Sequence, residues 1–600
     1  MRDLVRIGAG SGFARDSAVG VSQMLAHDPP DYLIFEQLAE QVMVNFLQEW
    51  QRSPDLGYSS ALVDVNLGPY LGAISAAGVK VITNGGGLRP HAAAAALQRL
   101  ADQLGLRLKI AVVEGDNLND RLGEFSRQGY CDMFTGEAWP ENLVAAHAYM
   151  GAFPIAAALD MGADIVITGR VVDSALTLGP LIHEFGWNRS DYDKLAAGTV
   201  AGHILECGGQ ATGGTFTDYC DIPDTDNIGF PIAECRPDGT FVVTKPEGTG
   251  GLVSIGTVSE QLLYEVSDPA AYLVPDVVCD VTEVRMAQLG PDRVEVTGAR
   301  GMPPSGFYKV CGMVEAGWRV TAMHPVIGID AVAKARRMAD GLLARANRLL
   351  EAAKLPPWSA VQRDIIGAGE LFAAWSQGNM QPSEVVSRIV VIHDDIRGAN
   401  VFRNEYLASL TNGSPGTIGT GTPPAIPVHR LFSFLLRRDS IAAVVTYGDA
   451  VKHLAPESAE QPTPAARPRA RMAMLDVSGD ASVPLIALAW GRSGDKGNLY
   501  NIGIIARRFE YLPYIRSALS EEAVSNWLRH TFDDPSTGRV RRYDVPGINA
   551  LNFVAKEALR GGGAVGLSLD ANAKGMAQQL LQMPVAVPAA LAAKWDGVRL

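Results

Sequence analysis

The segment VKVITNGGGLRPHAAAAALQRLADQLGLRLKIAVVEGD, residues 79–116, shows which class of fold this chain adopts. Its two ends, 79–83 and 108–116, are apolar almost throughout, which is typical of strands that are buried on both faces. Residues 91–105 between them are rich in alanine and leucine and predict a helix. A strand, a helix and a second strand in this order predict two parallel strands with a crossover helix.

The same alternation continues on both sides of this segment. Residues 31–36 and 163–169 have the pattern of further buried strands, whereas 36–50 and 141–162 have helical spacing. We therefore expect an α/β fold whose parallel sheet is covered by helices.

Beyond about residue 215 the pattern changes to alternating strands with Asp-Gly and Gly-Pro turns. These strands, which include FYKVCGMV and WRVTAMHP, predict an additional mixed β layer up to about residue 325. Residues 329–353 predict a long helix with basic residues on its polar face.

Proline, alanine and charged residues dominate 453–478 and predict a linker. We divide the chain there into a large domain, 1–452, and a small α+β domain, 479–600. In the small domain we expect two strands within 484–506 and helices at 520–532 and 548–559.

The composition restricts the class of partner. A chain of 600 residues with 47% hydrophobic content forms at least two domains. A net charge of −13 argues against nucleic acids and acidic membrane surfaces as partners and favours a small metabolite. The six cysteines form no C-x-x-C pair, which predicts reduced thiols. The sequence shows no apolar signal segment and no apolar run of about 18 residues, which predicts a soluble, cytoplasmic protein.

Glycine-bearing loops follow four of the predicted parallel strands, and such loops meet at one edge of a sheet. In the first, IGAGSGFARDS (7–17), the backbone around Gly10 and Ser11 could hold a phosphate or carboxylate, and the alternative is a tight structural turn. The other three loops supply polar side chains for the same ligand site, although each could also be a turn or helix cap: Asn84, Arg89, Asp116, Asn117, Arg170 and Asp173.

The motif GHILECGGQATGG (202–214) places His203, Glu206 and Cys207 on one face of a helix end. Partial burial would raise the pKa of Glu206 towards acid–base use, so Glu206 and Cys207 are candidates for a direct chemical role. The alternative is a helix end with a small apolar cysteine. We expect no metal, because no third ligand is visible near His203 and Cys207.

Three further loops carry charged candidates, and each also has a structural interpretation. TKPEGTGG (244–251) contains Glu247 in what could be a hairpin turn, and RGMPPSGFYK (300–309) contains Arg300 and Lys309, which could be surface cations. GRSGDKGN (491–498) lacks the ending of a nucleotide P-loop, and its Arg492 and Lys496 could bind either an anion or the first domain.

Six phrases occur in an order that resembles the acyclic terpene utilisation AtuA-like family: IGAGSGFARDS, NGGGLRP, GADIVITGRVVDSAL, GHILECGGQATGG, TKPEGTGG and GRSGDKGNLYNIGI. The resemblance covers about residues 3–450 as the large domain and 480–585 as a ferredoxin-like domain. It implies a role in the catabolism of citronellol- and geraniol-type terpenes, alongside a geranyl-CoA carboxylase and an enoyl-CoA hydratase. It implies an acyl-CoA ligand, with coenzyme A as part of the substrate and no other cofactor. It carries over no particular catalytic residue.

Together these observations favour a lyase or hydratase acting on a branched 3-hydroxyglutaryl-CoA-like thioester. In this hypothesis Arg170, Arg300 or Lys309 holds carboxylate or phosphate, while Glu206 or Glu247 moves the proton. Cys207 would act as an acid or as a thioester partner. The alternatives are a CoA-transferase or thioesterase with a covalent intermediate, and a non-catalytic binding or assembly subunit for an acyl-CoA carboxylase. We also expect a homo-oligomer.

Overall fold

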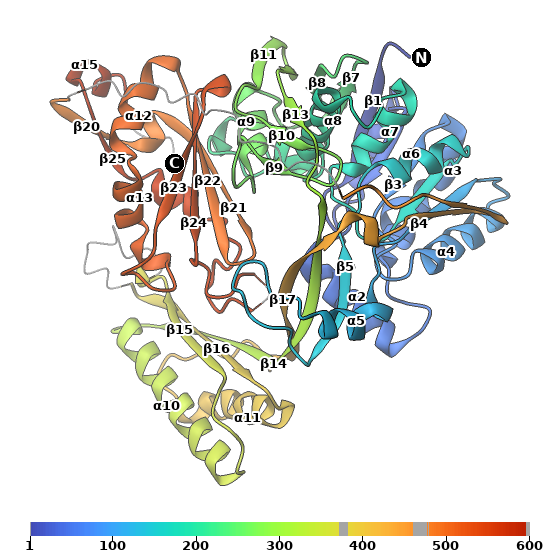
Figure 1. Cartoon of the computed structure of the whole chain (residues 1–600). Helices are drawn as coiled ribbons and strands as arrows, with labels where there is room; N and C mark the ends of the chain where they lie inside the picture. Colours follow the sequence, from blue (N-terminus) through green and yellow to red (C-terminus); the bar gives the residue numbers. More distant parts are fainter. Residues whose placement is uncertain (1, 371–381, 460–476, 478, 564, 596–600) are drawn as a thin grey trace.

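The protein was analysed as a computed structural model that describes residues 2–370, 382–459, 477, 479–563 and 565–595 (Figure 1). Its centre is an 11-stranded mixed sheet in the order β11-β12-β8-β7-β1-β2-β3-β6-β4-β18-β19. The five strands from β1 to β4 are parallel, and the flanking strands are antiparallel. The strands are β1 Val5–Ser11, β2 Tyr32–Phe35, β3 Lys80–Thr83, β4 Ile110–Glu114, β6 Ile165–Thr168, β7 Ile232–Cys235, β8 Phe241–Thr244, β11 Arg285–Gly290, β12 Arg293–Thr297, β18 Val444–Tyr447 and β19 Ala450–His453.

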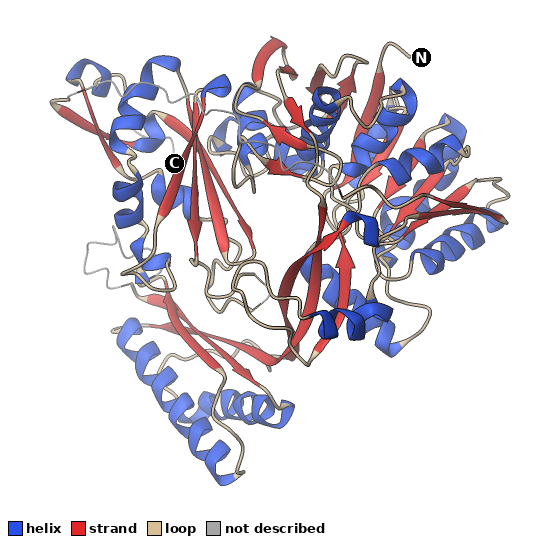
Figure 2. Ribbon diagram, in the orientation of Figure 1, coloured by secondary structure: helices blue, strands red, loops and turns tan. Residues whose placement is uncertain are grey.

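Both faces of the parallel strands are buried, which explains their apolar sequences. On β3, Val81 belongs to one hydrophobic core, whereas its neighbour Ile82 belongs to another on the opposite face, because side chains alternate along a strand. The helices of these layers (Figure 2) are α1 Val19–Ala26, α2 Glu40–Arg52, α3 Leu71–Ala77, α4 Pro90–Gln103, α6 Phe153–Asp160, α7 Ala175–Phe185 and α8 Tyr192–Leu205. The predicted α/β fold class is therefore confirmed, with the antiparallel strands extending the same sheet.

A 21-residue strand, β14 (Phe307–Ile327), connects this sheet with a lobe at the bottom of Figure 1. It pairs along its length with β5, β17 and β16, and two helices pack on its far half. The predicted strands FYKVCGMV and WRVTAMHP are thus one strand, whose register shifts near Glu315 against β17 and near Met313 against β5. The elements are β5 Leu143–Ala148, α5 Leu122–Gln128, β15 Ala360–Ile366, β16 Glu384–His393, β17 Ala425–Arg437, α10 Ala331–Ala352 and α11 Ile396–Asn412.

The C-terminal domain is a four-stranded antiparallel sheet in the order β21-β22-β24-β23, with helices on one face. Its other face lies beside α9 of the large domain (Figure 1). The large domain also contains a three-stranded sheet in the order β13-β10-β9. These elements are α9 Ile255–Leu263, β9 Tyr272–Leu273, β10 Val278–Asp280, β13 Arg300–Met302, β20 Ala481–Pro484, β21 Ala489–Lys496, β22 Leu499–Ala506, α12 Leu512–Ala518, α13 Glu521–Trp527, β23 Val540–Val545, β24 Ala550–Lys556, α14 Met576–Leu580, β25 Pro584–Val587 and α15 Ala589–Ala592.

Two predicted helices are wrong. Residues 141–162 form strand β5 followed by the short helix α6, because 143–148 pair with β14. Residues 548–559 contain β24, a central strand that pairs with both β22 and β23. A third helix, predicted from residue 36, begins only at Glu40. Residues 460–476 and 478 of the predicted linker lie outside the described residues.

Two buried asparagines attach the C-terminal sheet to the segment after α9. Asn501 Nδ2 donates to the Leu263 carbonyl (2.7 Å) and to Asn552 Oδ1 (2.8 Å). Asn552 Nδ2 donates to the carbonyls of Val266 (2.7 Å) and Ser267 (2.9 Å). Because these carbonyls have been taken out of water, the hydrogen bonds stabilise the contact between the domains.

We predict that Asn552→Leu destabilises the docked protein. The variant leaves buried carbonyls unpaired, and each such group costs about 1–3 kcal/mol. Chemical denaturation should show a loss of at least about 2 kcal/mol in the free energy of unfolding. Asn526→Leu, on the exposed face of α13, is the matched control and should change it by less than about 0.5 kcal/mol. Equal effects of the two substitutions would contradict this role of Asn552.

Candidate functional site

The carboxyl ends of the parallel strands lie level with one another. Phe35 at the end of β2 is in register with Thr83 at the end of β3, which is in register with Ile167 of β6. The residues that follow these strands therefore meet at one edge of the sheet, where ligands of α/β folds usually bind.

Asn84 organises the loop after β2. This buried side chain donates to Glu36 Oε1 (2.9 Å), and its own Oδ1 accepts from the Gln37 amide (2.7 Å). Burial raises the pKa of Glu36 well above its usual value, and the nearby Asp173 carboxylate adds to the rise. Fixed in this way, residues 36–39 stay extended and α2 starts only at Glu40.

Arg170 occupies the centre of the sheet edge. Its backbone amide donates to Asp116 Oδ2 (2.8 Å), and its guanidinium donates to Asp173 Oδ1 (2.8 Å) and the Leu38 carbonyl (3.2 Å). The preceding Gly169 permits this arrangement, because a Cβ there would lie 2.3 Å from Asp116 Oδ1. The Arg170 side chain is only 4% exposed, so these partners compensate a buried charge.

Tyr149, just after β5, connects Arg170 with α2 and β14. Its ring centroid lies 4.3 Å from Arg170 Cζ and 5.0 Å from Lys309 Nζ, and its hydroxyl donates to Glu40. Lys309 Nζ is also 3.9 Å from Glu40 Oε1. Burial alone would raise the pKa of Glu40, but the cations around it outweigh this effect and hold the pKa well below its usual value. Glu40 is therefore an anion at neutral pH.

Asp116, which holds the Arg170 amide, also contacts a histidine. His147 Nδ1 is 3.2 Å from Asp116 Oδ2, and both side chains are buried. On the paired strand Cys311 is opposite His147. Burial raises the pKa of the Cys311 thiol to about 12, so the thiol stays protonated.

The C-terminal end of α8 contributes an acid–base pair. His203 Nδ1 lies 3.2 Å from Glu206 Oε1, and residues 195–205 of the helix are all buried. Burial raises the pKa of Glu206, while Glu206 raises the pKa of His203 against the opposing effect of burial. In the described part of the chain His203 Nε2 and Glu206 Oε2 are buried without a hydrogen-bond partner. The protonation of His203 therefore depends on that of Glu206, and the pair has unused hydrogen-bonding capacity.

Cys207 follows this pair but is not activated as a nucleophile. Burial raises the pKa of its thiol well above the usual value, and the neighbouring Glu206 carboxylate raises it further. The reactive thiolate is therefore suppressed. The glycine loop after β1 packs on this residue, since a Cβ at Gly12 would lie 2.6 Å from the Cys207 carbonyl carbon.

The C-terminal domain adds cations to the same region. Lys496, at the end of β21, places Nζ 2.5 Å from Glu265 Oε2, and Lys574 Nζ is 3.5 Å from Glu265 Oε1. Burial disfavours the charged form of Lys496, yet Glu265, Glu40 and Asp173 raise its pKa well above the usual value.

These charges act on one another across the domains. Asp173 and Lys496 both affect the pKa of Glu206, in opposite directions, and Lys496 lowers the pKa of Glu40. Several of the side chains keep solvent-accessible surface, including Lys496 (44%), Lys309 (35%) and Glu40 (24%), so a ligand can reach them. We call this group the interdomain cluster: Glu36, Glu40, Tyr149, Arg170, Asp173, His203, Glu206, Glu265, Lys309 and Lys496.

The structure separates the predicted site residues into three sets. Those in the interdomain cluster or in direct contact with it are Asn84, Asp116, Arg170, Asp173, Glu206, Cys207, Lys309 and Lys496. Arg492 lies beside them, with its guanidinium 4.7 Å from the Tyr264 ring and donating to the Thr215 carbonyl (3.1 Å). Ser11 contacts the cluster only through the Glu36 backbone carbonyl. Those with structural contacts or positions elsewhere are Gly10, Arg89, Asn117, Glu247 and Arg300.

The glycine loop after β1 supports neighbouring backbone. Ser11 Oγ donates to the Glu36 carbonyl (3.0 Å) and accepts from Gln37 Nε2 (2.6 Å). A Cβ at Gly10 would lie 2.6 Å from the Phe35 ring, so glycine is needed for packing.

The remaining three loop residues have local contacts. Arg89 lies over the ring of Trp50 at 5.5 Å. Asn117 is exposed and accepts a hydrogen bond from the Asn119 amide (3.1 Å). Glu247 is exposed in a turn after β8.

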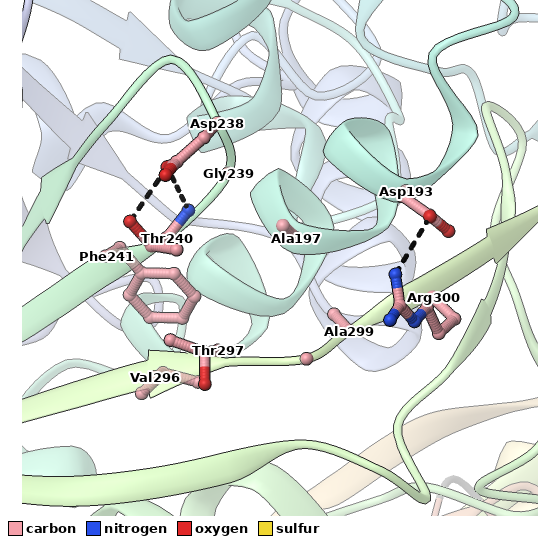
Figure 3. Close-up of a pocket in the computed structure, with 11 residues that line it drawn as sticks. Asp193, Ala197, Asp238, Gly239, Thr240, Phe241, Val296, Thr297, Ala299 and Arg300 are labelled. Atoms are coloured by element: carbon pink, nitrogen blue, oxygen red, sulfur yellow. Dashed lines mark hydrogen bonds and ion pairs between the residues drawn. The ribbon is translucent and has the colours of Figure 1, made fainter.

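Arg300 lies in a different hollow from the cluster. Figure 3 shows it in a pocket lined by residues of α8, β8 and β12, where it pairs with Asp193 (3.2 Å). Its side chain is 54% exposed. Because this pocket contains neither the acid–base pair nor the buried cations, we do not assign the chemistry to it.

The sequence analysis missed several members of the interdomain cluster. Glu36 directly follows a correctly predicted strand and Glu40 begins the next helix, and those positions were an available signal. Tyr149 was hidden because 141–162 was predicted as helix. Glu265 has no local signal, since only the docked C-terminal domain makes it a partner of Lys496.

Comparisons with known proteins came from family models. The model described as acyclic terpene utilisation family protein AtuA matches residues 5–447, and the one described as AtuA ferredoxin-like domain matches 483–586. Neither the curated proteins nor the solved structures gave a match. No helix among the described residues is long and apolar enough to span a bilayer. The same residues contain no group of three or more His, Cys, Asp or Glu side chains suited to a metal ion.

We predict that Glu36→Gln reduces the loss of stability at alkaline pH. Because the pKa of Glu36 is raised in the folded state, the folded protein holds the proton of this carboxyl more tightly than the unfolded chain does. The stability that this proton contributes is complete below the usual pKa of 4.5 and is lost as pH rises through the folded-state pKa. Glutamine keeps the Oε1 acceptor but cannot ionise. Between about pH 5 and about pH 8, the free energy of unfolding should decrease less in the Glu36→Gln variant than in the wild type, as measured by chemical denaturation at both pH values. Glu247→Gln, at the exposed turn, should leave the wild-type decrease unchanged.

Proposed function

Since this chain belongs to the acyclic terpene utilisation AtuA family, we propose that it is a lyase or hydratase for a branched 3-hydroxyglutaryl-CoA-like thioester in acyclic terpene catabolism. The matched family model covers most of the chain and supports the pathway. The reaction type is inferred from the side chains of the interdomain cluster.

The observation that carries the proposal is the His203–Glu206 pair. A carboxyl and an imidazole whose protonation states depend on each other, both with raised pKa, suit general acid–base catalysis near neutral pH. His203 Nε2 and Glu206 Oε2 are buried and unpartnered in the described structure, and in this proposal a substrate hydroxyl or C–H group takes the place of the missing partner.

In the lyase reaction, the pair removes the proton from the 3-hydroxyl group. The bond between carbons 2 and 3 then breaks, the oxygen becomes a ketone, and the electron pair forms the enolate of the thioester. The pair returns the proton to carbon 2. In the hydratase reaction the same pair removes a proton from carbon 2 and protonates the hydroxyl group, which leaves as water.

The buried Arg170 and the partly exposed Lys309 support the anionic part of such a substrate. Arg170 is fixed by Asp173 of its own loop and by three neighbouring loops, and Lys309 stands beside it over Tyr149. A preorganised guanidinium and ammonium stabilise developing enolate charge without reorganisation. Arg300, in the separate pocket of Figure 3, and Glu247, in its exposed turn, have no role in this proposal.

The covalent alternative has less support. A CoA-transferase or thioesterase acting through Cys207 needs a thiolate, whereas burial and Glu206 favour the protonated thiol. The non-catalytic alternative does not require a buried acid–base pair beside fixed cations. We therefore place acid–base chemistry first.

We predict that Glu206→Gln lowers kcat about 10²–10⁴-fold on branched 3-hydroxyglutaryl-CoA thioesters, because the pair can no longer transfer a proton. Turnover is measured by mass spectrometry of the thioester products. Glu247→Gln is the matched control and should retain wild-type turnover.

Full turnover by a folded Glu206→Gln variant would reject the assigned base. No turnover by the wild type, together with co-purification of an acyl-CoA carboxylase, would favour the assembly role. A trapped acyl-enzyme on Cys207 would favour the covalent alternative.

A further inference from the structure

The tip of the β21–β22 hairpin approaches the large domain very closely. A Cβ at Gly494 would lie 2.5 Å from Tyr264 Cε2 and 2.6 Å from Glu265 Cγ, so glycine is required at this contact. The close approach positions Lys496, two residues further along the strand, against Glu265. The C-terminal domain therefore supplies a cation to a site that is otherwise built by the large domain.

Lys496 lies between two groups of acids. Glu265 pairs with it directly at 2.5 Å, while Glu40 and Asp173 at the sheet edge act on it through space. The side chain is 44% exposed, which leaves part of it accessible to a ligand. The through-space effect of Glu40 and Asp173 on Lys496 distinguishes this contact from an isolated surface ion pair.

Glu265 has a second cation available. Lys574 Nζ is 3.5 Å from its Oε1, and Lys574 also lies 3.8 Å from Asp495 Oδ1 and donates to the Tyr264 hydroxyl. A buried carboxylate without a partner is strongly destabilising. Because Lys574 is in place, Glu265 stays compensated when Lys496 moves to another anion.

We propose that Lys496 binds a free carboxylate of the substrate by exchanging it for Glu265, which Lys574 then retains. This inference rests on the proposed function and deepens it. The substrate class is an acyl thioester with a second, unesterified carboxylate, and Lys496 holds that carboxylate while the His203–Glu206 pair acts on the reacting carbons. The C-terminal domain is thus the part of the protein that recognises the substrate's free acid.

The test uses the full chain and glutarate as the probe, with binding measured by calorimetry. Lys496→Met should weaken glutarate binding about tenfold, because a charge-assisted contact is lost. Glu265→Gln should tighten it, because the competing carboxylate no longer holds Lys496. The opposite signs are the diagnostic result, since a purely structural ion pair would make both variants bind more weakly or equally.

Two further variants complete the design. Lys574→Met should weaken binding, because Glu265 is left without a cation when Lys496 moves to the ligand. The effect should be smaller than that of Lys496→Met, because the binding cation itself is still present. Lys594→Met, an exposed lysine near the end of the same domain, is the matched control and should bind as the wild type does. Thermal unfolding of each variant verifies that it is folded.

The outcome separates this inference from the proposed function. Wild-type affinity in a folded Lys496→Met variant, weaker binding by Glu265→Gln, or no binding of glutarate by the wild type would overturn the exchange. If Glu206→Gln keeps full turnover while the Lys496 and Glu265 variants behave as expected, the proposed reaction fails and the carboxylate site stands.

Discussion

The buried guanidinium of Arg170 is the interaction on which the site depends. A buried arginine must be compensated from several directions, and its partners come from loops that are far apart in the sequence. Asp116 follows β4, Asp173 follows β6, and the Leu38 carbonyl follows β2. Tyr149 adds a ring from the end of β5. Satisfying this one charge therefore requires the strand ends to meet at a common edge, which also brings Glu40 and Lys309 together.

The C-terminal domain completes this arrangement through polar contacts on one face of its sheet. Asn501 and Asn552 bind the carbonyls after α9, whereas the opposite face is apolar and covered by the domain's own helices. Backbone carbonyls have fixed directions, so these hydrogen bonds set the position of the sheet more sharply than apolar contact does. That precision matters because Lys496 must come within reach of Glu265 and of the acids at the sheet edge.

The sequence was most informative where structure is local. Apolar strands followed by glycine loops predicted the parallel sheet, and Asn84, Asp116 and Arg170 could be placed because each directly follows a strand. It was misleading where a distant partner decides the conformation. Residues 143–148 are a strand only because β14, far along the chain, pairs with them.

Contacts between domains had no local signal at all. Gly494 lies in GRSGDKGN, which predicts only a polar loop, whereas the structure has it in β21 with Tyr264 and Glu265 against it. Arg300 and Glu247 were predicted as site residues from their charge, but both lie on other parts of the surface. The charge of a side chain does not show where the fold places it.

The position of Lys496 near the end of the chain has a consequence for synthesis. The sheet edge with Arg170 is encoded early, and domains generally fold in order as they leave the ribosome. A nascent or truncated chain can thus carry the acid–base pair for some time without the lysines of the last domain. Such a species would lack Lys496 and Lys574, so in the proposed function its acid–base pair could not yet select substrates by their free carboxylate.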